Sequence, residues 1–98
     1  MQWSNPKKLT RNNLNKEKER PAVYVILDQA KDPIYIGSSK RLRHRLEALY
    51  YGRADYNQVD HKKEMRQEAV YFIRQYTNIE RARRIEKQEK PNLKFNDL

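Results

Sequence analysis

Apolar runs and helical spacings mark most of the secondary structure that this chain can form. Residues 22–27 are a continuous β-branched and aromatic run, which is typical of a buried strand. A polar turn separates them from residues 34–36, and two short runs joined in this way predict an antiparallel hairpin. A third strand is expected over residues 69–73, or as far as residue 76.

The first predicted helix covers about residues 40–51. Its apolar side chains recur at i, i+4, i+7 and i+8, as in the stripe of an amphipathic helix. They are Leu42, Leu46, Leu49 and Tyr50. Ser38 or Ser39 can cap the N-terminus of this helix, and Gly52 is its expected end. The polar segment that follows leads to a short helix expected from Asp60.

The last predicted helix is capped by Thr77 or Asn78 and ends before Pro91. Its apolar positions are sparse, namely Ile79, Ala82 and Ile85. Glu86 lies on the same face as Ile79 and Ala82, whereas Glu80 faces outward. A carboxylate in an apolar stripe is a local inconsistency, and such inconsistencies gather at functional sites.

The order of these elements favours the α+β class. We expect a small three-stranded, mainly antiparallel sheet flanked by helices, in one domain over residues 21–98. Residues 1–20 lack an apolar period, so the sequence predicts a flexible basic N-terminal arm. Its charge either attracts phosphate or serves only solubility, and the residues do not decide between the two.

The composition narrows the class of partner. Lys and Arg number 22 against 13 Asp and Glu, which gives a net charge of +9. The excess falls in three blocks, at residues 1–20, 40–53 and 78–94, separated by near-neutral stretches. Such a basic domain favours a polyanionic partner.

Several classes of protein are excluded by what the chain lacks. It has no cysteine, which excludes a disulfide framework, a zinc–thiolate site and a cysteine nucleophile. His44 and His61 cannot form a multi-histidine metal site alone. No apolar run approaches the ~18 residues of a membrane span, and no run after Met1 resembles the apolar core of a signal peptide. We therefore expect an intracellular protein, cytoplasmic or associated with the nucleoid, with no membrane partner.

Two tyrosine motifs carry a resemblance to a known family. Tyr24 ends the triplet Ala-Val-Tyr, Tyr35 begins the triplet Tyr-Ile-Gly eleven residues later, and Arg45 follows Tyr35 by ten residues on the basic helix. This arrangement resembles the core of the GIY-YIG nucleases, over residues 22–96. The second motif is intact, and in the first motif Ala22 and Val23 stand where the family name has Gly and Ile.

The resemblance also implies a metal ligand on the last helix. The family places a glutamate there, often as Ala-x-x-x-Glu, and Ala82 followed by Glu86 has this form. An asparagine after a proline commonly lines the family's site, which here is Asn92 or Asn96 after Pro91. The spacing back from Asn92 fits Glu80 better than Glu86, so Glu80 stays an alternative to the preferred Glu86.

The chemistry that the resemblance implies is metal-assisted hydrolysis of a DNA phosphodiester by an Mg²⁺-dependent endonuclease. Tyr24 or Tyr35 would take a proton from the attacking water, because a nearby cation favours the phenolate. Arg45 would hold the scissile phosphate, and Glu86 would bind Mg²⁺ or Mn²⁺. Further contacts to nucleic acid are expected from Lys40, Arg41, Arg43, His44 and Asn96.

Other interpretations remain open. Taken alone, Tyr24 and Tyr35 fit ordinary strand aromatics, Arg45 fits a solvated helix residue, and Glu86 could pair with Lys90. A catalytically inactive relative that binds nucleic acid is the main alternative, and a basic module for a protein partner is another. Phosphate contacts carry no sequence information, so an active enzyme would recognise DNA structure, such as branches, or rely on a protein partner for specificity.

Overall fold

The computed structural model describes residues 3–52, 60–89 and 93. The α+β class is confirmed, but the sheet has four strands where the sequence predicted three. In chain order the elements are β1 (Lys7–Lys8), α1 (Arg11–Asn15), β2 (Ala22–Leu27), β3 (Pro33–Ser39), α2 (Leu42–Tyr51), α3 (Asp60–Glu68), β4 (Tyr71–Tyr76) and α4 (Ile79–Glu89).

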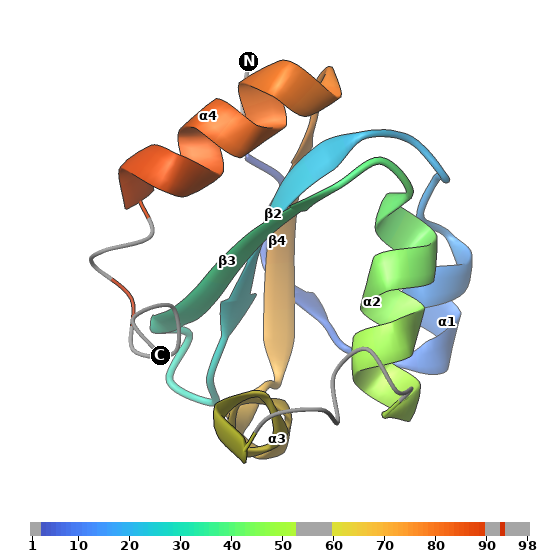
Figure 1. Ribbon diagram of the computed structural model, residues 1–98. Coiled ribbons are helices and arrows are strands. Elements are labelled where there is room, and N and C mark those ends of the chain that lie inside the picture. Colours follow the sequence, from blue (N-terminus) through green and yellow to red (C-terminus); the bar gives the residue numbers. More distant parts are fainter. Residues whose placement is uncertain (1–2, 53–59, 90–92, 94–98) are drawn as a thin grey trace.

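The sheet has the strand order β1-β4-β2-β3, and each neighbouring pair is antiparallel. The predicted hairpin is present as β2 and β3, with Ala22 opposite Ser39 and Tyr24 opposite Gly37. On its other side β2 pairs with β4, so β2 is central and β3 lies at an edge. Helix α4 covers one face of the sheet, and α2 lies against the other face (Figure 1).

Each face of the sheet has its own hydrophobic core, because alternate residues of a strand point to opposite faces. Ala22, Tyr24 and Ile26 of β2 pack with the leucines of α2 and with Met65 and Phe72. Val23, Val25 and Leu27 pack on the α4 side with Ile36 and Ala82. Burial on both faces explains why β2 is apolar throughout rather than alternating.

The observed element boundaries differ from the predicted ones by about two residues. Helix α2 begins at Leu42 rather than Lys40, and the Ser39 hydroxyl accepts a hydrogen bond from the Arg41 N–H at 3.0 Å. It ends at Gly52, whose φ of 70° is left-handed and suits glycine. Asn78 caps α4 as expected, since its Oδ1 accepts from the Arg81 N–H at 2.8 Å.

The third predicted strand starts later than expected. Its N-terminal residue, Ala69, closes α3 instead, because its N–H donates to the carbonyl of Met65. The strand itself, β4, then runs from Tyr71 to Tyr76, within the longer of the two predicted limits.

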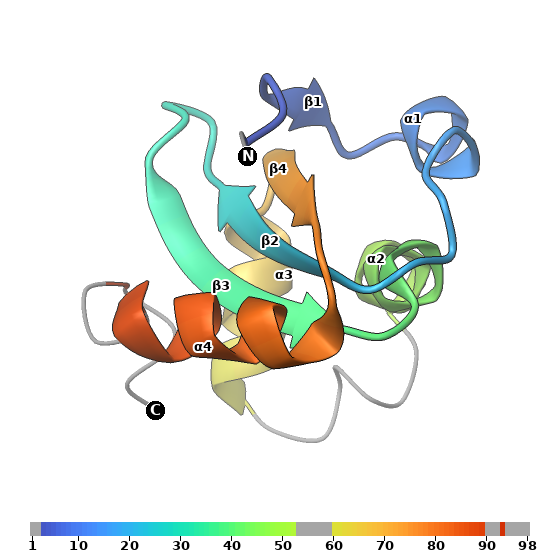
Figure 2. The same ribbon diagram turned by 90° about the horizontal axis from the view of Figure 1, so that it is seen from above.

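Residues 3–20 correct the expectation of a flexible arm. Lys7 and Lys8 pair with Phe72 and Tyr71 as a short edge strand, and α1 follows with Thr10 as its N-cap. Leu14 is buried against the α2 side of the core. Figure 2 shows this segment running along the β4 edge of the sheet and on to the flank of α2. The segment is held by backbone pairing and by one buried leucine, and neither produces a hydrophobic period that the sequence could show.

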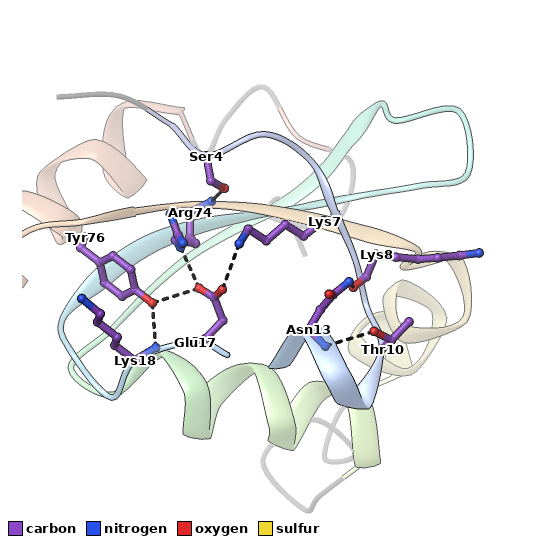
Figure 3. Close-up of polar contacts among 9 residues, drawn as sticks. All are labelled: Ser4, Lys7, Lys8, Thr10, Asn13, Glu17, Lys18, Arg74 and Tyr76. Atoms are coloured by element: carbon purple, nitrogen blue, oxygen red, sulfur yellow. Dashed lines mark hydrogen bonds and ion pairs between the residues drawn. The ribbon is translucent and has the colours of Figure 1, made fainter. Parts of the chain in front are cut away.

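A buried carboxylate also ties the N-terminal segment to β4 (Figure 3). Glu17 is only 4% exposed, and its Oε1 accepts hydrogen bonds from Arg74 Nε at 2.7 Å and from the Tyr76 hydroxyl at 2.9 Å. Its Oε2 lies 3.6 Å from Lys7 Nζ. The Tyr76 hydroxyl oxygen accepts from the Lys18 N–H at 2.8 Å. The network therefore joins β1, the segment after α1 and β4.

The two donors on β4 keep their protonated forms over a wide pH range. Burial raises the pKa of Tyr76 above its ordinary value of 10.0. For Arg74, burial alone would lower the pKa, but the hydrogen bond and charge of Glu17 raise it further, so the net shift is upward. Glu17 thus faces a cation and a neutral hydroxyl at all physiological pH values.

We predict that Glu17→Ala lowers the free energy of unfolding by about 2 kcal/mol, because it leaves Arg74 partly buried without its carboxylate. The loss stays below that of a fully buried pair, since the Arg74 side chain is 22% exposed. Urea denaturation measures it. Glu64→Ala removes an exposed carboxylate from α3 and should change stability by less than about 0.5 kcal/mol. Equal effects of the two substitutions would contradict a stabilising role for the network.

Candidate active site

The predicted catalytic residues come from four elements that meet at the edge strand β3. Tyr24 lies on β2, Tyr35 on β3, Arg45 on α2 and Glu86 on α4. Because β3 ends the sheet, side chains from either face can approach one another around it.

The two tyrosines form a pair on the α2 side of the sheet. Tyr24 is 1% exposed and Tyr35 is half-buried, and their ring centroids lie 6.3 Å apart with planes tilted by 40°. Tyr24 stands opposite Gly37, and a Cβ at Gly37 would lie 2.5 Å from the Tyr24 hydroxyl oxygen. The glycine of the second motif is thus required because the Tyr24 side chain lies directly over it.

A serine and a glutamate form a second pair on the α4 side. The Ser38 hydroxyl donates a hydrogen bond of 2.5 Å to Glu86 Oε1, which joins β3 to α4 across 48 residues of sequence. Glu86 is half-buried on the face of α4 that packs on the sheet, whereas Glu80 is exposed as expected. The carboxylate in the apolar stripe therefore has a partner on the strand that carries the second motif.

Ser38 was predicted from the sequence only as a possible helix cap and not as a site residue. Its register opposite Val23 turns it to the α4 face, away from the N-terminus of α2. The predicted hairpin did not give this register, because the pairing shifts at an irregularity between Ile26 and Leu27.

A basic pocket of 330 Å³ connects the two faces at the end of β3. It is lined by Ser38, Ser39, Lys40, Arg41, His44, Arg45, Ile79 and Arg83. The pocket therefore brings Arg45 and three of the predicted nucleic-acid contacts to the serine that holds Glu86. Its lining contains cationic side chains and no carboxylate, so it suits an anion.

The other predicted contacts lie elsewhere. Arg43 does not line the pocket, because its guanidinium pairs with Glu47 at 3.2 Å and donates to Asn15 Oδ1 at 3.3 Å. Asn92 and Asn96 lie outside the described residues.

The carboxylate of Glu19, in the N-terminal segment, contacts two residues that line the pocket. Its Oε1 accepts from the His44 N–H at 2.7 Å, and its Oε2 lies 3.2 Å from Arg41 Nη2. An acceptor at the N-terminus of α2 satisfies a backbone N–H that the helix itself leaves open. This contact fixes the start of α2, and with it the helix that carries Arg45, against the segment preceding β2.

The donor chemistry of the site fits a hydrated hard cation. Within residues 3–52, 60–89 and 93, no group of three or more His, Asp or Glu side chains gathers in one place. Glu86 alone would offer one carboxylate, and Mg²⁺ characteristically binds through one or two carboxylates while keeping several waters. Zinc would need three or four protein ligands, which this arrangement does not supply.

Three features together define a small α+β domain of the nuclease type: the hairpin, Tyr24 over Gly37 with Tyr35 beside it, and the carboxylate on α4. The family model described as the GIY-YIG catalytic domain matches residues 20–96, and the chain belongs to this family. The resemblance found in the sequence is therefore confirmed.

Solved structures support this assignment. The chain is similar to the GIY-YIG N-terminal endonuclease domain of UvrC from Thermotoga maritima. A point mutant of that domain bound to its catalytic divalent cation is 26% identical, with a TM-score of 0.68 over 87% of this chain and 91% of that chain. The magnesium-bound structure of the domain is also 26% identical, with a TM-score of 0.67 over 87% of this chain and 92% of that chain.

No curated protein matches the chain significantly. Among the helices that the structure describes, none combines the length and apolar character that crossing a bilayer requires.

Proposed function

We propose that this chain is a divalent-metal-dependent endonuclease that hydrolyses phosphodiester bonds of DNA. One observation carries the proposal: a single basic pocket is lined both by Arg45 and by Ser38, whose hydroxyl holds Glu86. An anion in this pocket would lie between a guanidinium and the carboxylate best suited to bind a metal ion. The similarity to a UvrC endonuclease domain bound to magnesium supports the same chemistry.

In this proposal Arg45 binds the scissile phosphate. A guanidinium can form two parallel hydrogen bonds to phosphate oxygens, and it stays charged at every relevant pH. Because the pocket preorganises it beside Ser38, it can stabilise the negative charge that develops on the phosphate during hydrolysis.

Glu86 would hold Mg²⁺ or Mn²⁺, and the bound ion would neutralise phosphate charge and lower the pKa of water. Ser38 orients the carboxylate through its hydrogen bond to Oε1, which leaves Oε2 as the oxygen to face an ion. The ligand would then be positioned before any metal binds.

We assign the general base to Tyr35 rather than Tyr24. Tyr24 is 1% exposed and packed over Gly37, so an attacking water has poor access to it. Tyr35 is half-buried at the edge strand and packs beside Tyr24. A divalent cation held near Tyr35 would favour the phenolate form that accepts the proton.

The substrate that we propose is DNA held by its backbone. Lys40, Arg41 and His44 line the pocket beside Arg45, and such residues bind phosphates without reading bases. The site therefore suits recognition of DNA structure, or targeting by a protein partner that reads sequence.

The departure in the first motif does not favour the inactive alternative. Ala22 and Val23 are both fully buried, and each packs into the core on its own face of β2. They lie under the site as strand residues, while Tyr24 keeps its place opposite Gly37. Alanine in place of glycine and valine in place of isoleucine thus change the packing of the core rather than the side chains of the candidate site.

The test is a cleavage assay of the purified chain on supercoiled, linear and branched DNA. We expect Mg²⁺ or Mn²⁺ to support nicking of supercoiled DNA to open circles, and a chelator to reduce it to background. Binding of the same DNA without cleavage under either metal would overturn the endonuclease proposal in favour of an inactive nucleic-acid-binding protein.

A further inference from the structure

The basic pocket has a second wall that the catalytic proposal does not use. Arg83 projects from α4 into the lining of the pocket, and Lys40, Arg41 and Arg45 line it from the end of β3 and from α2. Arg83 precedes Glu86 by three residues, so the two side chains lie on neighbouring parts of one helix face. Helix α4, which carries Glu86, thus also places the guanidinium of Arg83 at the basic pocket.

The charge of Arg83 is available to a ligand. Its side chain is exposed, and it forms no ion pair with any other residue that the structure describes. By contrast, Arg41 at the same pocket is paired with Glu19, and Arg43 on α2 is paired with Glu47. An arginine that lines a carboxylate-free pocket without an internal partner is suited to binding an external anion.

We propose that Arg83 binds a backbone phosphate next to the scissile one, so that the cleaved strand is held between α2 and α4. This inference rests on the proposed function, in which Arg45 holds the scissile phosphate from α2. Successive phosphates of one strand lie close enough together for facing helices to contact neighbours. Arg83 then sets the direction in which the strand crosses the end of β3.

Two other arginines on the same helix serve as internal controls. Arg81 and Arg84 are exposed like Arg83, but neither lines the pocket. Substitution of any of the three removes one positive charge from α4. A purely electrostatic effect of net charge would therefore be the same for all, whereas a pocket contact would single out Arg83.

The experiment measures DNA binding and cleavage by Arg83→Ala, Arg83→Lys and Arg84→Ala. In a chelator, anisotropy of a labelled duplex oligonucleotide should show about tenfold weaker binding for Arg83→Ala, and a salt dependence reduced by about one phosphate contact. Arg84→Ala should weaken binding by at most about twofold. In Mg²⁺, Arg83→Ala should raise KM more than it lowers kcat, and Arg83→Lys should recover part of the loss.

The outcomes separate this inference from the proposed function. Equal effects of Arg83→Ala and Arg84→Ala, in a protein that cleaves DNA, would overturn the inference and leave the endonuclease intact. A selective binding defect of Arg83→Ala in a protein that never cleaves would support Arg83 as a contact to a backbone phosphate, but would overturn the endonuclease and with it the place of that phosphate next to a scissile one. Failure of the unaltered chain to bind DNA would overturn both.

Discussion

Replacement of Arg45 by alanine is expected to lower the rate of DNA cleavage by about 10²–10³-fold while the protein stays folded. Arg45 lines the basic pocket beside Ser38, and in our proposal it stabilises the charge of the phosphate in the transition state. Loss of one preorganised donor of this kind costs a reaction about this factor. The fold should tolerate the change, because alanine favours helix and the α2 stripe of Leu42, Leu46 and Leu49 is untouched. Single-turnover cleavage of supercoiled DNA in Mg²⁺ measures the rate.

The matched control for this prediction is Arg43→Ala. It removes the same charge from the same helix, two residues away, but Arg43 points to Glu47 and Asn15 rather than into the pocket. We expect it to weaken DNA binding modestly and to change the single-turnover rate at saturating DNA by no more than about threefold. Arg45→Lys tests whether the planar guanidinium is needed, since lysine keeps the charge but cannot form two parallel hydrogen bonds to a phosphate. Undiminished cleavage by Arg45→Ala would remove Arg45 from the mechanism.

The parts of the fold that the sequence predicted correctly are those that depend on a local pattern of residues. The continuous run of β2, the stripe of α2 and the cap at Asn78 each depend on neighbours in sequence, so a local pattern can indicate them. The ordered N-terminal segment was not predicted, because a charged residue fixes it to the sheet. Glu17 is buried only because Arg74, Tyr76 and Lys7 surround it, and three such contacts distant in sequence leave no local signal.

In the candidate site, Tyr24, Tyr35, Arg45 and Glu86 were predicted from the resemblance to the family. Glu86 was also predicted from its place in an apolar stripe. Ser38 and Arg83 emerge only from the register of the hairpin and from the packing of α4 against β3. Arg43 was predicted to contact nucleic acid from its place in a basic run. In the structure it pairs with Glu47 and does not line the pocket.

Replacement of Glu86 by glutamine is expected to abolish metal-dependent cleavage and to weaken Mn²⁺ binding by at least about tenfold. Glutamine keeps the size of the side chain and still offers Oε1 to the Ser38 hydroxyl, so the contact between β3 and α4 can persist. What it removes is the negative charge that a hard divalent cation requires of its one protein carboxylate. Isothermal titration with Mn²⁺ measures binding independently of activity, and thermal unfolding without metal confirms that the variant is folded.

Glu80→Gln decides between the two carboxylates that the sequence left open. Glu80 lies on the same helix but is exposed, and six residues separate it from Glu86. Because its side chain faces away from β3, its substitution should leave both Mn²⁺ affinity and cleavage within about twofold of the unaltered chain. Loss of Mn²⁺ binding in Glu80→Gln but not in Glu86→Gln would reverse the assignment, and the Ser38–Glu86 hydrogen bond would then serve only to pack α4 on the sheet. Loss in neither variant would place the ion away from α4 and remove the carboxylate from the proposed mechanism.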